Sequence, residues 1–244
     1  MSIMTDEFVK ATLYWIKNFN EKAKELLKKK AVVVMSGWLD STVLLYKIID
    51  EWYEPYAISF NYWQKHSKEL ECAKKTCEKL WVNHKIVDVS FLKDLLDSSL
   101  LNDNEEIPEG DYREETMKST VVPSRNLIFS SIAIGYWQSI GAKVVALWVH
   151  WGDHTIYPDC RDEFINKLNE VAKISDWHYI ELYCPFTNIS KSDVVKIWKD
   201  LDVDFSLTWS CYKWGEKPCW KCWTCVERLE AFHDNWLEDV LDYN

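Results

Sequence analysis

Short apolar runs alternate along this chain with longer segments of helical periodicity, and this alternation limits the possible folds more than any other feature. Residues 31–35 form a continuous apolar run, which is typical of a strand buried on both faces of a sheet. Further strands are predicted at residues 56–60, 84–89, 143–149 and 178–182, and helices at residues 42–50, 65–80, 126–140, 159–174 and 189–199. Strands separated by helices join into parallel sheets, so the sequence predicts an α/β fold with a Rossmann-like, doubly wound parallel sheet.

Segments at both ends of the chain lie outside this alternation. Residues 5–30 have apolar side chains at helical spacing and end in a lysine run that suits a helix C-terminus. The last part of the chain is a cysteine-rich loop followed by a predicted helix at residues 224–236. Three units are therefore expected: an N-terminal helical extension at residues 1–30, a sheet domain at residues 31–204, and a cysteine-rich helical module at residues 205–244.

The composition is that of a soluble globular protein, with 28% charged and 48% hydrophobic residues. A net charge of −10 argues against broad nucleic-acid binding, because a phosphate backbone attracts basic surfaces. No stretch approaches the roughly 20 apolar residues of a membrane span, and residues 1–10 lack a basic-then-apolar signal pattern. We therefore expect a cytoplasmic protein without direct contact to nucleic acid or membrane.

The connection between the first predicted strand and its helix, residues 36–41, reads S-G-W-L-D-S. Free backbone N–H groups and the positive end of a helix dipole meet at such a connection, which favours an anion such as phosphate. Gly37 permits positive φ and close backbone approach, and Asp40 can cap the helix or hold Mg²⁺ through water. An ordinary strand–turn–helix connection is the alternative, because Ser, Gly and Asp are common in turns. The Gly-Lys-Ser/Thr ending of a Walker A loop is absent.

Eight cysteines are present, and four of them crowd into residues 211–225. Their spacing is C-x7-C-x2-C-x2-C, and close C-x2-C pairs place thiolates on one metal ion. Four thiolates make a closed tetrahedral site that fits structural Zn²⁺. A disulfide cluster and an iron–sulfur cluster are the alternatives. The predicted ligands are Cys211, Cys219, Cys222 and Cys225.

Three other polar segments are expected at the sheet edge where open α/β sheets bind ligands. Lys65 and His66 can meet a phosphate or a carboxylate, and Arg125 suits an anion. Asp159 and Arg161 form part of a segment that follows a strand and a loop. The alternatives are a solvated helix start for His66, a surface position for Arg125 and a helix cap for Asp159.

Together these motifs resemble a known family. Residues 36–41 resemble the SGGxDS signature of PP-loop ATP pyrophosphatases, which adenylate a carboxylate or carbonyl oxygen and release pyrophosphate. The motifs Y-x-Q-x-H, P-x-R-N, Y-P-D-C-R and T-W-S-C-Y follow in order, at residues 62–66, 123–126, 157–161 and 208–212. From residue 31 to its C-terminus the chain resembles the 7-cyano-7-deazaguanine synthases, and residues 5–30 form an extra feature.

The resemblance implies an ATP-dependent ligase that acts on 7-carboxy-7-deazaguanine and ammonia. One ATP activates the carboxylate for amide formation, and a second activates the amide, which loses water to give a nitrile on the way to queuosine or archaeosine in tRNA. It further implies Mg²⁺, structural Zn²⁺ and a homodimer. The catalytic residues it implies are Asp40, Lys65, His66, Arg125, Asp159 and Arg161. The ATP-binding residues it implies are Met35, Ser36, Gly37, Trp38, Leu39, Asp40, Ser41, Thr42, Val43, Leu44 and Leu45.

Tryptophan occupies positions where this resemblance predicts glycine or another small residue. The chain has 15 tryptophans and six glycines, although usage of roughly 7% would give about 17 glycines. The clearest such positions are Trp38, Trp63, Trp148, Trp177, Trp214, Trp220, Trp223 and Trp236, whereas Trp209 fits the family. We hypothesise that glycines have been systematically replaced, and a lineage with tryptophan-rich turns is the alternative. At Trp38 the indole would stand where phosphates approach, and a positive φ there would add roughly 1–2 kcal/mol of strain.

Two other functions are compatible with the sequence. Another PP-loop adenylating enzyme, such as a tRNA-thiolating enzyme or an NAD synthetase, would share the phosphate loop, although the net charge disfavours a tRNA surface. A non-catalytic, zinc-stabilised binding protein is expected if Trp38 blocks the nucleotide site.

Overall fold

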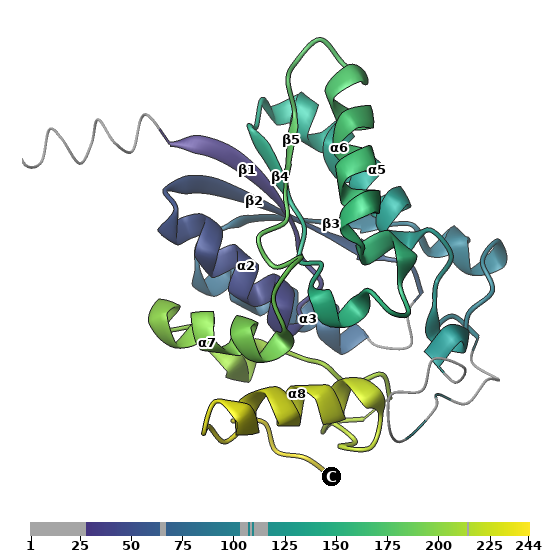
Figure 1. Cartoon of the computed structure of the whole chain (residues 1–244), viewed down its shortest axis with the longest axis vertical. Helices are drawn as coiled ribbons and strands as arrows, with labels where there is room; N and C mark the ends of the chain where they lie inside the picture. Colours follow the sequence, from purple (N-terminus) through teal and green to yellow (C-terminus); the bar gives the residue numbers. More distant parts are fainter. Residues whose placement is uncertain (1–27, 64–66, 103–106, 108, 110–116, 214) are drawn as a thin grey trace, which may run out of the picture.

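Five parallel strands form one sheet in the order β3-β2-β1-β4-β5, as seen in the computed structural model (Figure 1). The structure describes residues 28–63, 67–102, 107, 109, 117–213 and 215–244. The strands are β1 Lys29–Val34, β2 Tyr53–Asn61, β3 Asn83–Asp88, β4 Val144–Ala146 and β5 Glu181–Tyr183. The strand order reverses between β1 and β4, so the predicted doubly wound α/β fold is confirmed.

Helices cover both faces of the sheet (Figure 1). The α-helices are α2 Leu39–Asp50, α3 Ser67–Lys79, α5 Arg125–Ile140, α6 Asp162–Ile174, α7 Lys191–Leu201 and α8 Trp223–Asp234. Side chains alternate across β1: Val32 packs into the hydrophobic cluster beneath α5 and α6, and Val33 into the cluster beneath α2 and α3. Helix α7 packs on α2, and α8 packs on α7. None of the described helices is long and apolar enough to cross a membrane.

The predicted N-terminal helix falls mostly outside the described residues, and its last residues are not helical. Lys29 and Lys30 belong to β1, where they pair in register with Tyr53 and Glu54 of β2. The lysine run was therefore wrong as a helix C-terminus, because pairing with β2 extends the strand beyond its apolar part. The strand predicted at residues 143–149 is also shorter, with β4 limited to Val144–Ala146.

The start of α7 is fixed by the predicted capping residues. The Asp193 N–H donates to Ser190 Oγ at 3.1 Å, and the Ser190 N–H donates to Asp193 Oδ2 at 3.0 Å. This reciprocal pair is a capping box, so the helix begins at Lys191 rather than at residue 189. The capping box therefore places Lys191 at the first helical position.

The tryptophan positions divide into two groups by backbone conformation. Trp63, Trp220 and Trp236 have φ of 64°, 52° and 58°, a region that favours glycine. Trp38 has φ of −78°, so the expected backbone strain at that position is wrong. Trp223 opens α8 and is helical, so no glycine-requiring turn exists there. Trp148 and Trp177 are absent from the residues with positive φ, and Trp214 lies outside the described residues.

Candidate active site and metal centre

A cleft opens at the carboxyl edge of the sheet, beside the point where the strand order reverses. Residues that follow β1, β2 and β4 contribute to its wall, as do the first turns of α5, α7 and α8. Ligands of open α/β sheets bind at this location. The elements that the sequence predicted to carry functional residues therefore converge on one cleft.

Hydroxyl groups organise the loop between β1 and α2. The Ser36 and Ser41 Oγ atoms lie 3.0 Å apart, and the Trp38 N–H donates to Ser36 Oγ at 3.3 Å. Trp38 precedes the first residue of α2 and supplies no side-chain cap. The partial positive charge of this helix N-terminus is therefore available to an anion.

Gly37 has φ of +82° and no room for a side chain. A Cβ atom there would lie 1.9 Å from the carbonyl oxygen of Glu69 in α3. The predicted need for positive φ and close approach is confirmed, and the approaching group is the backbone of α3. The Gly37 carbonyl also accepts the Trp209 N–H at 2.9 Å, which ties the loop to the segment before the cysteines.

The indole of Trp38 stands inside the cleft. Its Nε1–H donates to the carboxylate of Glu69, and its ring lies 5.2 Å from the ring of Tyr212 at an interplanar angle of 51°. These contacts hold the indole beside the phosphate loop. The indole therefore takes up space in the cleft next to this loop.

Lys191 is buried between two carboxylates that line the same cleft. Its Nζ lies 3.2 Å from Asp40 Oδ2 and 2.7 Å from Glu227 Oε2. Burial alone would lower the pKa of Lys191, but Asp40 and Glu227 raise it overall, so the ammonium stays charged. Asp40 lies in the first turn of α2 and does not cap it. Sequence reasoning missed Lys191 and Glu227, although the capping box marks the position of Lys191.

His150 and Asp153 follow β4 and extend this charged cluster. The buried His150 Nε2 lies 3.5 Å from Asp153 Oδ2 and 4.0 Å from Asp40 Oδ1. The Gly152 N–H donates to His150 Nδ1 at 3.1 Å, so a neutral ring carries its proton on Nε2, facing the carboxylates. Burial, together with nearby Glu227 and Asp40, raises the pKa of Asp153 despite the opposing effect of His150.

Arg125 opens α5 and lies among tyrosines that line the cleft. Burial would lower the pKa of Arg125, but Tyr62, Tyr157, Tyr212 and Asp159 raise it overall. Burial in turn raises the pKa of Tyr62 to about 12, so its hydroxyl remains a donor at neutral pH. A guanidinium and phenolic hydroxyls together form a receptor for a planar anion such as a carboxylate.

An aromatic wall lies next to this receptor. The rings of Phe60 and Phe129 stack at 4.2 Å, and Tyr62 lies 5.2 Å from Phe129. All three line the cleft. They give it a largely apolar side against which a flat heterocycle can pack.

The remaining predicted site residues lie elsewhere or act indirectly. Asp159 Oδ2 accepts the Asn126 N–H at 3.0 Å, so it caps α5 rather than the helix that follows it. Arg161 donates to the His154 carbonyl at 2.6 Å and holds the preceding loop. Neither is among the residues that line the cleft. Lys65 and His66 lie outside the described residues.

In the predicted ATP-binding segment, some residues line the cleft and others are buried in the core. Met35, Ser36, Trp38 and Asp40 line the cleft. Ser41 and Thr42 are buried polar residues, and Leu39, Val43, Leu44 and Leu45 are fully buried in the core beneath α2. The apolar members therefore fix the position of the helix whose N-terminus faces the cleft.

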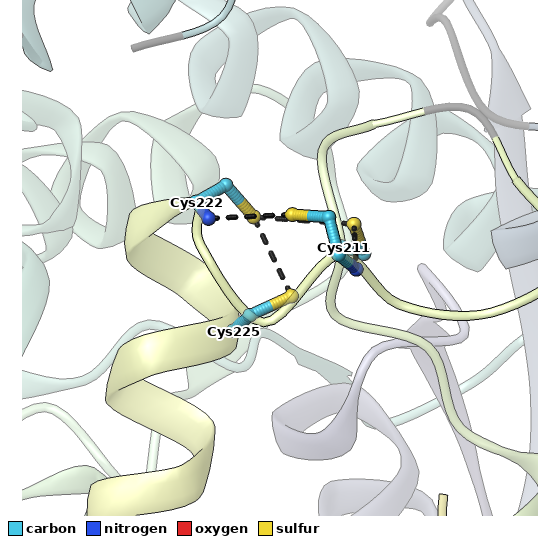
Figure 2. Close-up of side chains that lie close together, drawn as sticks. Cys211, Cys222 and Cys225 are labelled. Atoms are coloured by element: carbon cyan, nitrogen blue, oxygen red, sulfur yellow. Dashed lines mark hydrogen bonds between the residues drawn. The ribbon is translucent and has the colours of Figure 1, made fainter. Parts of the chain in front are cut away.

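Cys211, Cys222 and Cys225 point toward one another beside α8 (Figure 2). The Sγ atoms of Cys211, Cys219, Cys222 and Cys225 all lie within 4.8 Å of one another. Tetrahedral coordination at a Zn–S length of about 2.3 Å requires sulfurs about 3.8 Å apart, and the Cys222 and Cys225 sulfurs are 3.5 Å apart. All eight cysteines are unpaired, so the disulfide alternative does not hold. The cluster is suited to a metal ion.

Backbone N–H groups donate to two of the sulfurs in this cluster. The Lys213 and Cys219 N–H groups donate to Cys211 Sγ at 3.3 and 3.4 Å, and the Cys222 N–H donates to Cys219 Sγ at 3.3 Å. Hydrogen bonds from the Cys222 and Cys225 thiols lower the pKa of Cys211. Thiolates are the form that binds metal ions, so the surroundings of Cys211 favour the form that a metal ion would bind.

The cysteine cluster is also continuous with the cleft. Cys211 directly precedes Tyr212, which lines the cleft, and Cys222 precedes α8, which contributes Thr224 and Glu227 to the wall. A metal ion bound here would therefore hold two parts of the wall in place.

A doubly wound sheet with a loop suited to an anion at its switch point, joined to a four-cysteine cluster suited to a metal ion, agrees with the PP-loop class that residues 36–41 resemble. The sequence model of the family described as queuosine biosynthesis protein QueC matches residues 30–236. The chain belongs to this family.

Relatives cover most of the chain. A 7-cyano-7-deazaguanine synthase from Caldicellulosiruptor saccharolyticus is 51% identical over 214 residues, which is 88% of this chain and 95% of that protein. Synthases of the same name from Methanoregula boonei and Psychromonas ingrahamii are 49% and 45% identical and are covered over 99% of their lengths. The similarity therefore extends over both the sheet domain and the cysteine module.

Proposed function

We propose that this protein is an ATP-dependent carbon–nitrogen ligase that converts 7-carboxy-7-deazaguanine and ammonia to 7-cyano-7-deazaguanine. The names of its relatives support this activity. The observation that carries the proposal is that one cleft holds the phosphate loop, the buried Lys191 and the tyrosine-lined Arg125. A phosphate chain and a substrate carboxylate each find a cationic partner in the same space.

The first half of the reaction forms an amide. A carboxylate oxygen attacks the α-phosphorus of ATP, and pyrophosphate leaves. Lys191 and the N-terminus of α2 are placed to stabilise the negative charge on the departing pyrophosphate. Ammonia then attacks the acyl carbon and loses a proton, and AMP leaves with the bonding electrons.

The second half forms the nitrile and needs a proton acceptor. The amide oxygen attacks a second ATP, pyrophosphate leaves, and the adenylated amide loses AMP and the protons on its nitrogen as the carbon–nitrogen triple bond forms. We assign the acceptor role to Asp153, because it lines the cleft and has a raised pKa. His150, 3.5 Å away, orients the Asp153 carboxylate.

The substrate end of the cleft follows from its side chains. Arg125 and its tyrosines would hold the substrate carboxylate, and Phe60 and Phe129 would pack against the deazapurine ring. Lys65 and His66 are proposed ligand contacts on the resemblance alone. Asp159 and Arg161 would act by positioning α5 and the loop after β4.

Two metal ions complete the proposal. Zn²⁺ would bind the four-cysteine cluster, which offers only thiolate donors at tetrahedral spacing, and would have a structural role. Mg²⁺ would accompany the ATP phosphates, with Asp40 as a ligand through water, and would supply charge neutralisation during phosphoryl transfer.

The remaining expectations rest on composition and resemblance. A net charge of −10 supports a protein that does not bind nucleic acid directly. We also propose a homodimer in the cytoplasm. Light scattering of the purified protein measures whether it is a dimer.

The test of function is product formation. The protein is incubated with 7-carboxy-7-deazaguanine, ammonium, ATP and Mg²⁺, and the nitrile and AMP are measured by mass spectrometry. The proposal predicts two AMP for each nitrile. AMP release without amide or nitrile would favour another PP-loop adenylating enzyme.

A second candidate function follows from the indole in the cleft. Because the indole of Trp38 stands beside the phosphate loop, a zinc-stabilised binding protein without catalysis is the second candidate for the chain with tryptophan at this position. Calorimetric titration with ATP distinguishes the two. Heat of ATP binding supports the enzyme, and its absence in a folded, zinc-loaded chain supports the binding protein.

A further inference from the structure

Tryptophan occupies most of the backbone positions that resist side chains. Seven non-glycine residues in the described part of the chain have φ in the left-handed region, and five of them are tryptophan. They are Trp52, Trp63, Trp81, Trp220 and Trp236, with φ between 52° and 65°. A Cβ atom crowds the following carbonyl in this region, so glycine is common there and a bulky residue is an outlier.

One glycine shows what these positions require. Gly141 ends α5 with φ of +66°, and the N–H of Ala142 donates to the Trp137 carbonyl at 3.2 Å. This six-residue hydrogen bond is the Schellman motif, in which the left-handed residue is usually glycine.

Two tryptophans reproduce the geometry of Gly141. The N–H that follows Trp81 donates to the Cys77 carbonyl at 2.9 Å, and the N–H that follows Trp236 donates to the Phe232 carbonyl at 3.1 Å. These bonds end α3 and α8 as the equivalent bond ends α5. Among the described residues, three helices therefore end with this hydrogen bond, and one of the three carries glycine at the left-handed position.

The two tryptophan side chains at these helix ends bury almost no surface that could offset the backbone strain. The indoles of Trp81 and Trp236 are 96% and 95% exposed. By contrast, Trp209 is buried, and its Nε1–H donates to the Cys211 carbonyl at 2.9 Å. The indole of Trp209 is thus packed and hydrogen-bonded in the structure, whereas the indoles of Trp81 and Trp236 lie in solvent.

We propose that the working form of this protein carries glycine at the five left-handed tryptophans and also at Trp38, which has an ordinary φ but whose indole lines the cleft beside the phosphate loop, and that one codon accounts for all six positions. The codon UGA is decoded as tryptophan in some genetic codes and as glycine in others. A single decoding difference explains why tryptophan, and no other bulky residue, stands at these positions. Trp209 is then specified by UGG, which means tryptophan in both codes.

This inference does not depend on the reaction proposed above, but it changes the cleft. With glycine at position 38 the loop reads S-G-G-L-D-S. The space that the indole fills between Glu69 and Tyr212 then becomes part of the ligand site.

The direct test is the mass of tryptic peptides from the protein purified from the organism that makes it, read beside the codons of its gene. The inference predicts UGA codons and glycine masses at the six positions, with UGG and a tryptophan mass at position 209. Tryptophan masses at the six positions, or UGG codons there, would overturn it.

Recombinant variants test the physical reason separately. Trp81→Gly and Trp236→Gly are each expected to raise the melting temperature by about 2–4 °C. The control is Trp177→Gly, since Trp177 is 99% exposed but is not among the positive-φ residues. Equal melting temperatures for all three variants and the parent chain would show that glycine is not required at these helix ends.

Discussion

The ammonium of Lys191 lies 3.2 Å from Oδ2 of Asp40, and this contact joins the first turn of α7 to the first turn of α2 beside the phosphate loop. Glu227 of α8 approaches the same ammonium at 2.7 Å. Three helices that are distant in sequence therefore meet at one buried cation. A phosphate group entering the cleft would find this cation already held in place.

Replacing Lys191 with methionine is expected to lower kcat for nitrile formation by roughly 100- to 1,000-fold, because one preorganised cation is lost from the leaving pyrophosphate. The matched control is Lys196→Met, an exposed lysine on the same helix. Circular dichroism checks that both variants fold. A folded Lys191→Met variant with the activity of the control would remove Lys191 from the mechanism.

The raised pKa of Asp153 predicts a pH dependence. A proton acceptor works only when it is deprotonated, so the rate of the amide-to-nitrile step should rise with pH through that pKa and then level off. Asp153→Asn should abolish the rise and lower the plateau by about 10²- to 10⁴-fold. Asp162→Asn, an exposed carboxylate that opens α6, should keep the parental profile. An unchanged profile in Asp153→Asn would assign the proton to another group.

The cysteine cluster predicts one tightly bound zinc ion per chain. Cys222→Ser should lose the metal and lower the melting temperature, since Cys222 is buried at the start of α8. Cys72→Ser, outside the cluster, should keep it. Elemental analysis of the purified variants makes the comparison. Full zinc content in Cys222→Ser, or iron in the parent protein, would contradict this assignment.

A buried ion pair ties α8 to the C-terminal segment. Arg228 is 1% exposed and donates two hydrogen bonds to Asp239, at 2.6 and 2.9 Å. Asp239→Ala should lower the free energy of unfolding by about 3–5 kcal/mol, because it leaves a buried cation without its partner. Asp242→Ala removes an exposed pair with Lys217 and should cost about 0–1 kcal/mol. Urea unfolding measures both losses. Equal losses would show that the buried Arg228–Asp239 pair stabilises the fold no more than the exposed pair does.

Acid should weaken the same ion pair. Burial alone would raise the pKa of Asp239, but Arg228 and Tyr243 lower it overall. A lowered carboxyl pKa stabilises the fold above the ordinary carboxyl pKa, and the contribution is lost as pH falls through the folded value. Asp239→Ala should therefore flatten the acid limb of the stability curve.

Hydrophobic pattern was sufficient to predict the sheet and its helices. A continuous apolar run such as residues 31–35 has few alternatives to a buried strand, and helical periodicity between such runs implies parallel pairing. The start of β1 at Lys29 could not be predicted from hydrophobic pattern. Lys29 and Lys30 join the strand because they pair with β2, and this pairing depends on the neighbouring strand rather than on local periodicity.

In the candidate site, too, local patterns could be predicted from the sequence and long-range contacts could not. The phosphate loop and the cysteines are local patterns, so their residues could be read from spacing. Lys191 and His150 carry no local signature, because their roles depend on Asp40 and other residues far away in the chain. Asp159 was correctly placed near a helix start, but only the folded chain shows that the helix is α5.

We propose that the nitrile forms in the cleft between the phosphate loop and Arg125. The most direct measurement is mass-spectrometric detection of 7-cyano-7-deazaguanine formed by the chain carrying glycine at the six proposed positions. We predict nitrile that accumulates with time and requires ATP, ammonium and the carboxylate substrate. A folded, zinc-loaded protein that binds ATP yet forms neither amide nor nitrile would contradict the account.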